Sequence, residues 1–214
     1  MSQAATGHVD VDTYQNPLTP ESWSKLAMWI FLAGDAMSFG GLLAAYGALR
    51  SSMPTCAEGV PAPCWPYPSH VLGIAMTGFM TFLLICSSVS MVQALAAVQD
   101  GNQKGFRNWM MLTILGGISF LSMQAYEWTH LIHEGFRLTQ NEWGAPQFGT
   151  TFFILTGFHG CHVFGGVCYL SVILLGAMRG KYGPTNYAPV ETVGLYWHFV
   201  DLIWILVFTF VYLV

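Results

Sequence analysis

The chain ends with the stretch GLYWHFVDLIWILVFTFVYLV, residues 194–214, which has the composition of a membrane-spanning helix. After Gly194 it contains no Gly, Pro, Lys or Arg. About 20 helical residues cross the roughly 30 Å of hydrocarbon in a bilayer, and this stretch is long enough to do so. His198 and Asp201 nevertheless lie inside it, three residues apart. Polar side chains at this depth are unfavourable in lipid, so these two indicate a face that contacts protein or water.

The whole chain has the composition of an integral membrane protein. Of its 214 residues 54% are hydrophobic and 8% are charged, whereas a typical soluble domain has about 25% charged residues. The net charge of −4 is not accompanied by a basic stripe, so nucleic acid is not an expected partner. Residues 1–22 are polar and lack the basic start of a signal peptide, so we expect the first apolar segment to direct insertion.

Five apolar segments predict an all-α membrane bundle. Their hydrophobic runs are continuous rather than alternating, which disfavours a barrel, and backbone groups in lipid are satisfied within a helix. We expect a polar tail over residues 1–23 and one membrane domain over 24–214. The predicted spans cover about 26–49, 71–98, 108–131, 148–178 and 191–214.

The basic residues predict the orientation of the bundle. Five fall on the side of the N-terminus and two on the opposite side, which places the N-terminus in the cytoplasm and the C-terminus outside. The two groups are Lys25, Lys104, Arg107, Arg179 and Lys181 on the inner side, and Arg50 and Arg137 on the outer side.

The loop over residues 51–70 then lies outside. It contains five prolines and is not expected to be helical. An oxidising compartment permits a disulfide between Cys56 and Cys64, and the seven residues between them, AEGVPAP, allow the chain to turn back.

Eight polar residues inside the spans are the candidate functional residues. Glu191, His198 and Asp201 are separated by seven and three residues and therefore share one helix face. One interpretation is hydrogen bonding between helices. The other is metal or haem ligation by the pairs His130/His133 and His159/His162, but this spacing alone is weak and no Cys-x-x-Cys-His motif is present. The eight are Asp35, Gln124, Glu127, His159, His162, Glu191, His198 and Asp201.

Four of the segments resemble one family. The run FFILTGFHGCHVFGG at 152–166 is similar to the signature of subunit III of the haem–copper oxidases. LYWHFVDLIWILVFTFVYL at 195–213 resembles the last helix of that family, and MQAYEWTHLIHEG at 123–135 resembles its preceding motif. MWIFLAGDAMSFGG at 28–41 resembles the helix that carries an intramembrane carboxylate. The resemblance covers about residues 24–214, without the 51–70 loop.

The resemblance implies a five-helix form of a subunit without catalytic residues or a metal centre of its own. Oxygen reduction then takes place at haem and copper in subunit I, with subunit II and possible supercomplex partners beside it. It also implies a V-shaped cleft that holds phospholipids, a bundle core made mostly by the second to fifth spans, and location in the bacterial inner membrane. The eight polar residues are then structural or lipid-binding groups.

Some alternatives stay open at the level of sequence. Many mitochondrial-type relatives carry Glu at the position of Asp35, and Asp is found, for instance, in quinol-oxidising members, so Asp35 does not identify the electron donor. We favour cytochrome c because cytochrome c oxidase is the commoner case, and keep quinol as the alternative. An independent transporter that uses the buried carboxylates is a more distant possibility. A membrane enzyme with its own metal at the histidine pairs is the third.

Overall fold

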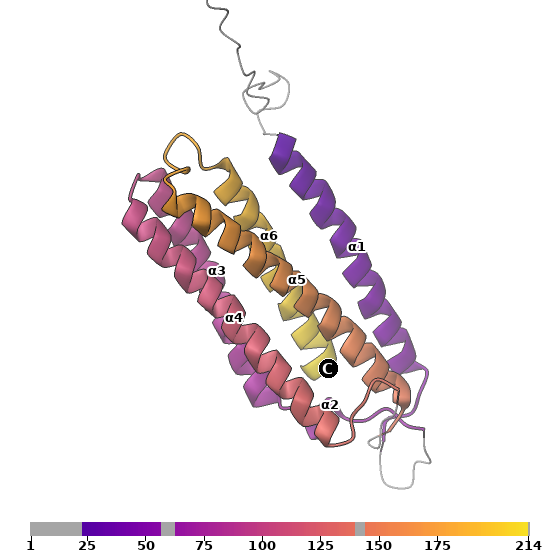
Figure 1. Cartoon of the computed structure of the whole chain (residues 1–214). Helices are drawn as coiled ribbons and strands as arrows, with labels where there is room; N and C mark the ends of the chain where they lie inside the picture. Colours follow the sequence, from indigo (N-terminus) through magenta and orange to yellow (C-terminus); the bar gives the residue numbers. More distant parts are fainter. Residues whose placement is uncertain (1–22, 57–62, 140–143, 214) are drawn as a thin grey trace, which may run out of the picture.

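The computed structural model describes residues 23–56, 63–139 and 144–213 (Figure 1). These parts contain five helices long and apolar enough to cross a membrane and no strand longer than an isolated bridge, as predicted. The helices are α1 (Trp23–Ser51), α3 (Ile74–Gln99), α4 (Gln103–His133), α5 (Pro146–Met178) and α6 (Ala188–Val207), which continues into the π-helical segment η2 (Phe208–Leu213).

The loop between the first two spans differs from the prediction. It ends in a short helix, α2 (Pro68–Val71), so the expectation of no helix in residues 51–70 was wrong. Proline is tolerated in the first turn of a helix, where its missing N–H has no intrahelical partner to lose. The chain then takes an extended conformation at Leu72, so that the second span begins at Ile74 rather than at residue 71.

Helices α3 and α4 form a closely packed antiparallel pair. Gly101, with φ of +75°, makes the tight turn between them, and the side chain of Asn102 accepts a hydrogen bond from the backbone N–H of Gly105 at 3.0 Å. In the middle of the pair, a Cβ atom on Gly116 would lie 2.6 Å from the Cβ atom of Ser87. A larger residue at this position would force the two helices apart.

Two tryptophans of α6 anchor that helix to α3. The indole of Trp197 donates to the Ser87 hydroxyl at 3.1 Å, and that of Trp204 donates to the Thr81 hydroxyl at 2.9 Å. The Trp197 ring also fills the space above Gly166 of α5, where an added Cβ atom would come within 2.9 Å of it. Both indoles are buried and paired, as the interior of a bundle requires.

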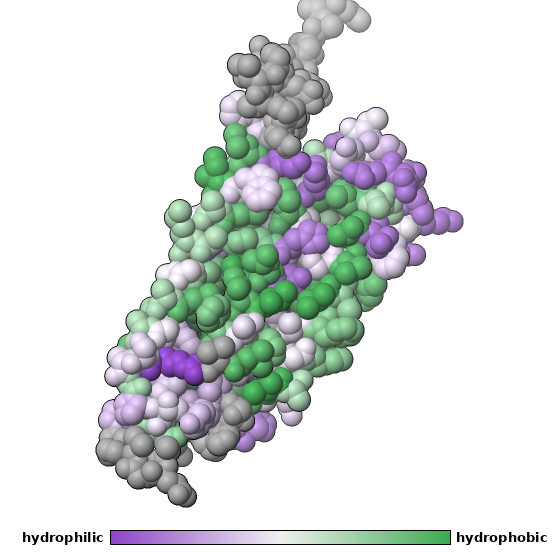
Figure 2. Space-filling model, turned by 180° about the vertical axis from the view of Figure 1, so that it is seen from behind, coloured by the Kyte–Doolittle hydropathy of each residue, from purple (hydrophilic) through white to green (hydrophobic). Residues whose placement is uncertain are grey.

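Helix α1 lies at the edge of the bundle and packs mainly against α5 and α6 (Figure 1). Within its most hydropathic window 11% of the residues are buried, compared with 28% to 50% in the other four spans. The second to fifth spans therefore contribute most of the core, as the resemblance implied, and α1 adds Leu32, Phe39 and Tyr46. The space-filling view in Figure 2 is mainly hydrophobic through the middle of the molecule, with a smaller hydrophilic area inside that band.

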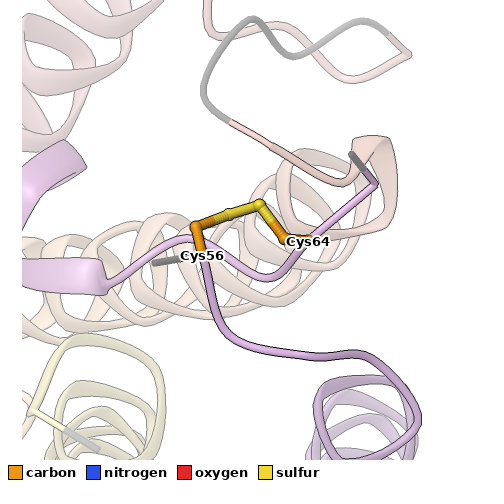
Figure 3. Close-up of a disulfide and its surroundings, with 2 residues drawn as sticks. All are labelled: Cys56 and Cys64. Carbon is orange, nitrogen blue, oxygen red and sulfur yellow. A yellow bond between two sulfur atoms is a disulfide. The ribbon is translucent and has the colours of Figure 1, made fainter. Parts of the chain in front are cut away.

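The loop after α1 is fastened by a disulfide between Cys56 and Cys64, with Cα atoms 4.9 Å apart (Figure 3). Backbone bonds reinforce it: Cys56 N–H donates to Trp65 O at 2.9 Å, and Ala145 N–H donates to Cys64 O at 2.7 Å. The Trp65 ring is 1% exposed and packs edge-on against Tyr46 of α1. The loop thus ties the end of α1 to the start of α5.

Candidate functional site

The carboxylate of α1 meets a histidine of α5. Asp35 Oδ2 lies 3.0 Å from His162 Nε2, and both side chains are about 15% exposed. The contact is close but off the N–H direction, since Oδ2 has no aligned hydrogen-bond donor among the described residues. The Tyr196 hydroxyl of α6 donates to the backbone carbonyl of His162 at 2.9 Å. Three helices therefore meet at this pair.

The two ring nitrogens of His162 have different partners. Its Nδ1 lies 2.8 Å from the carbonyl oxygen of Phe158, which only accepts, so Nδ1 carries a proton. Nε2 is the nitrogen that faces the Asp35 carboxyl group, at 3.0 Å. His162 therefore contacts its own helix through one ring nitrogen and α1 through the other.

Glu127 of α4 is a buried carboxylate with two neutral donors. The Thr77 hydroxyl of α3 donates to Oε1 at 3.0 Å, and the Tyr212 hydroxyl of η2 donates to Oε2 at 3.2 Å. Glu127 is 5% exposed and Tyr212 is 1% exposed. The π-helical end of the chain brings Tyr212 to this carboxylate, so Glu127 joins α3, α4 and η2.

Two other predicted residues lie at the interface of α4 and α5. The Gln124 amide donates to the Thr156 carbonyl at 2.8 Å and covers Gly160, where a Cβ atom would lie 3.1 Å from its Oε1. His159 is fully buried and has no hydrogen-bond partner among the described residues. Its ring lies 4.8 Å from that of Trp204 and 5.7 Å from that of Phe120, so its environment is aromatic.

The three polar residues of α6 reach two different helices. Glu191 Oε1 forms an ion pair with Lys25 Nζ of α1 at 3.0 Å. His198 Nδ1 lies 2.5 Å from the Ser88 hydroxyl of α3. Asp201 is 7% exposed, lies within hydrogen-bonding reach of Ser88, and has an Oδ1 atom without a partner among the described residues.

The histidine pairs do not converge with other metal-ligating residues. In the described parts of the chain no three His, Cys, Asp or Glu side chains come together in a way that could hold a metal ion. His130 instead lies 3.6 Å from Glu134 one turn along α4, and His162 faces Asp35. His159 and His162 both lie near the ring of Phe39, but only His162 faces a carboxylate.

The partners of the predicted residues were not identified from the sequence. They are hydroxyl groups and one lysine, and hydroxyl side chains are too common in membrane helices to stand out singly. A signal was present in α3, where Thr77, Thr81 and Ser88 recur at steps of four and seven and so share one face. The missed partners are Lys25, Thr77, Ser88, Tyr196 and Tyr212.

These features define a multi-pass membrane protein whose intramembrane polar groups connect its helices. Sequence comparison gives the family. The profile described as cytochrome c oxidase subunit III matches residues 16–214.

Individual relatives agree with this match. The chain is 36% identical over 185 residues to cytochrome c oxidase subunit 3 of Corynebacterium diphtheriae, covering 86% of this chain and 85% of the relative. It is 38% identical to cytochrome c oxidase subunit 3 of Synechocystis, and the match covers 86% of this chain and 72% of the relative. It is 31% identical to cytochrome c oxidase subunit 3 of Alkalihalophilus pseudofirmus, and that match covers 88% of this chain and 85% of the relative. The chain belongs to the cytochrome c oxidase subunit III family.

Proposed function

We propose that the chain is the accessory, non-redox subunit III of a terminal respiratory oxidase that reduces oxygen to water and pumps protons. It binds subunit I directly, with subunit II and possible supercomplex partners nearby, and supports proton uptake by subunit I. The observation that carries the proposal is the family match over residues 16–214. The contacts support it: most of the eight predicted polar residues bridge helices.

Purification through a tag on this chain in mild detergent tests the proposal. The expected result is copurification of larger subunits whose optical spectrum contains haem, together with oxygen consumption. Recovery of this chain without any haem protein, but with solute transport in vesicles, would support the transporter alternative and overturn the proposal.

The chain itself is proposed to hold no haem or copper. His159 lies against an aromatic ring, His162 faces a carboxylate, and His198 contacts a hydroxyl group. Metal analysis after dissociation of the other subunits tests this, because a stoichiometric metal retained by the isolated chain would contradict it.

Bound phospholipid is also part of the proposal. Support comes from a cavity of about 400 Å³ between α1 and η2, mainly apolar, with a guanidinium group at the end where α1 stops. It is lined by Leu43, Ala44, Tyr46, Gly47, Arg50 and Phe210. We expect Asp35→Ala, which loosens α1, to lower lipid retention and to shorten the turnover lifetime while leaving the haem spectrum and the initial rate nearly normal. Unchanged lipid content and lifetime would remove Asp35 from this role.

The N-terminus is proposed to lie in the cytoplasm of a bacterial cell, with the C-terminus in the periplasm. The five-to-two division of basic residues supports this orientation. Single-cysteine labelling at Asn102 in intact cells tests it: we expect labelling only after the membrane is permeabilised, and labelling from outside would reverse the topology.

Cytochrome c is the proposed electron donor, supported by the names of the relatives. Oxygen uptake by the purified complex with reduced cytochrome c and with quinol distinguishes the two donors. Turnover with quinol alone would select the quinol oxidase alternative.

A further inference from the structure

A polar cluster between α3 and α6 is directed toward the outer surface of the bundle. Ser88 and His198 are both partly exposed, and exposed apolar side chains lie at steps of three, four or seven residues from them on the same helix faces. We call this surface the α3–α6 face. It comprises Ile85, Ser88 and Val92 of α3 and His198, Leu202 and Ile205 of α6, with the buried Asp201 beneath it.

The polar centre of this face lies near the middle of the membrane. His198 and Asp201 are ten and thirteen residues into the 26-residue segment Ala188–Leu213. Lipid head groups are about 15 Å away from the bilayer centre, half the hydrocarbon thickness. Acyl chains offer no hydrogen-bond donor or acceptor, so they leave a polar atom on this face without a partner.

The hydrogen bonds within the cluster define what the face presents. The Ser88 hydroxyl has one proton and lies within reach of both the Asp201 carboxyl group and His198 Nδ1. When the hydroxyl donates to the carboxylate, its oxygen accepts from Nδ1–H. A neutral imidazole then has an acceptor at Nε2, and Nε2 has no hydrogen bond to any described residue.

We propose that the α3–α6 face docks a transmembrane helix of a partner subunit, which places a hydrogen-bond donor on Nε2 of His198. The inference rests on the proposed function and identifies which face of the chain meets the oxidase. A second copy of the chain is a poor occupant, because a two-fold axis through the centre of this face would bring the two Nε2 acceptors together with no donor between them. A partner hydroxyl, amide or basic side chain complements the face.

Photo-crosslinking in intact membranes tests the location. A benzophenone amino acid replaces Leu202 or Val92 on the face, and Leu115 of α4, which is 58% exposed, serves as the matched control. We expect crosslinks from Leu202 and Val92 to a haem-bearing complex, identified by mass spectrometry, and lipid adducts from Leu115. Crosslinks from the face only to lipid, or only to a second copy, would overturn the proposal.

Two substitutions of His198 separate docking from internal structure. The amide of His198→Asn occupies the position of Nδ1 and retains the contact with Ser88, whereas that of His198→Gln reaches the position of Nε2. We expect His198→Asn to lower the amount of this chain retained per haem by about threefold, the factor for ~0.6 kcal/mol, an average membrane hydrogen bond. With His198→Gln, the amount of this chain retained per haem should stay near that of wild type.

If less of the His198→Gln variant than of the His198→Asn variant is retained per haem, His198 serves the internal structure of the chain and the proposal is overturned. Equal retention of both variants and of wild type would also overturn it. Monodisperse elution of each variant in detergent shows that it has folded. If wild type recovers no haem protein, the proposed function fails; if haem protein is recovered but only Leu115 crosslinks to it, this inference alone fails.

Discussion

The two acid–histidine sets in the membrane are built differently. Asp35 and His162 come from α1 and α5, far apart in sequence, and their side chains meet at 3.0 Å. Asp201 and His198 lie three residues apart on α6, and both reach Ser88 of α3. The first set connects two helices directly. The second set joins two residues of one helix to a third on another helix, and it leaves Nε2 of His198 available at the surface.

The difference follows from how each helix is held. Helix α1 is mostly exposed, so the Asp35–His162 contact is a large part of what positions it. Helix α6 is fastened independently by the indoles of Trp197 and Trp204. A polar residue on α6 is therefore less needed for the position of its helix, and remains free to serve an interface.

The largest effect is expected for Asp35→Ala. The substitution leaves His162 without its partner and should lower the free energy of unfolding in detergent by about 1–3 kcal/mol. Hydrogen exchange should increase in α1 but not in α6. Met37→Ala, on the exposed side of the same helix, is the control. Unchanged exchange in α1 would show that other contacts hold this helix.

A pair of double-mutant cycles makes the comparison quantitative. Asp35→Asn with His162→Gln should give a coupling energy of about 0.6–1.7 kcal/mol, the range from the mean to the maximum for polar contacts in membranes. Asp201→Asn with His198→Gln should give a smaller coupling energy of about 0.5 kcal/mol, the low end for residues of one hydrogen-bond network, since the two side chains interact only through Ser88. Chemical unfolding of the four variants of each cycle measures both, and the reverse order would contradict the assigned roles.

Loss of the hydrogen bond from the Trp204 indole should destabilise α6 more than loss of the Asp201 carboxylate. Trp204→Phe deletes the donor to Thr81 and should lower the unfolding free energy by about 0.5–1.5 kcal/mol. Asp201→Asn should have a smaller effect on the purified chain. Trp109→Phe, on a more exposed indole, controls for loss of aromatic area. If Asp201→Asn lowers the unfolding free energy more than Trp204→Phe does, Asp201 contributes more than the indole to the position of α6.

The smallest effect is expected at the ion pair of Lys25 with Glu191, whose side chains are 24% and 33% exposed. Lys25→Ala should lower the unfolding free energy by about 1 kcal/mol at most, because solvent screens exposed pairs. The loss should disappear in high salt. Lys104→Ala at the start of α4 is the control, and a salt-independent loss would indicate a role other than charge.

Much of the fold could be predicted because it depends on local sequence. Apolar runs long enough to cross the bilayer must be helical there, which located the five spans to within a few residues. The cysteines flanking AEGVPAP were close enough in sequence for their pairing to be expected, and the structure joins them. The short helix at Pro68 was not predicted, because the number of prolines outweighed the favourable position of the last one.

The sequence by itself determined that this protein is a five-helix membrane bundle of one family, and which polar residues lie within its spans. Only the tertiary structure decided their partners: His162 for Asp35, Thr77 and Tyr212 for Glu127, and Ser88 for His198. Helical periodicity relates residues on the same helix, but says nothing about how two helices are rotated toward each other. That rotation depends on close packing, as where Gly116 admits Ser87, and the sum of such contacts selects one arrangement.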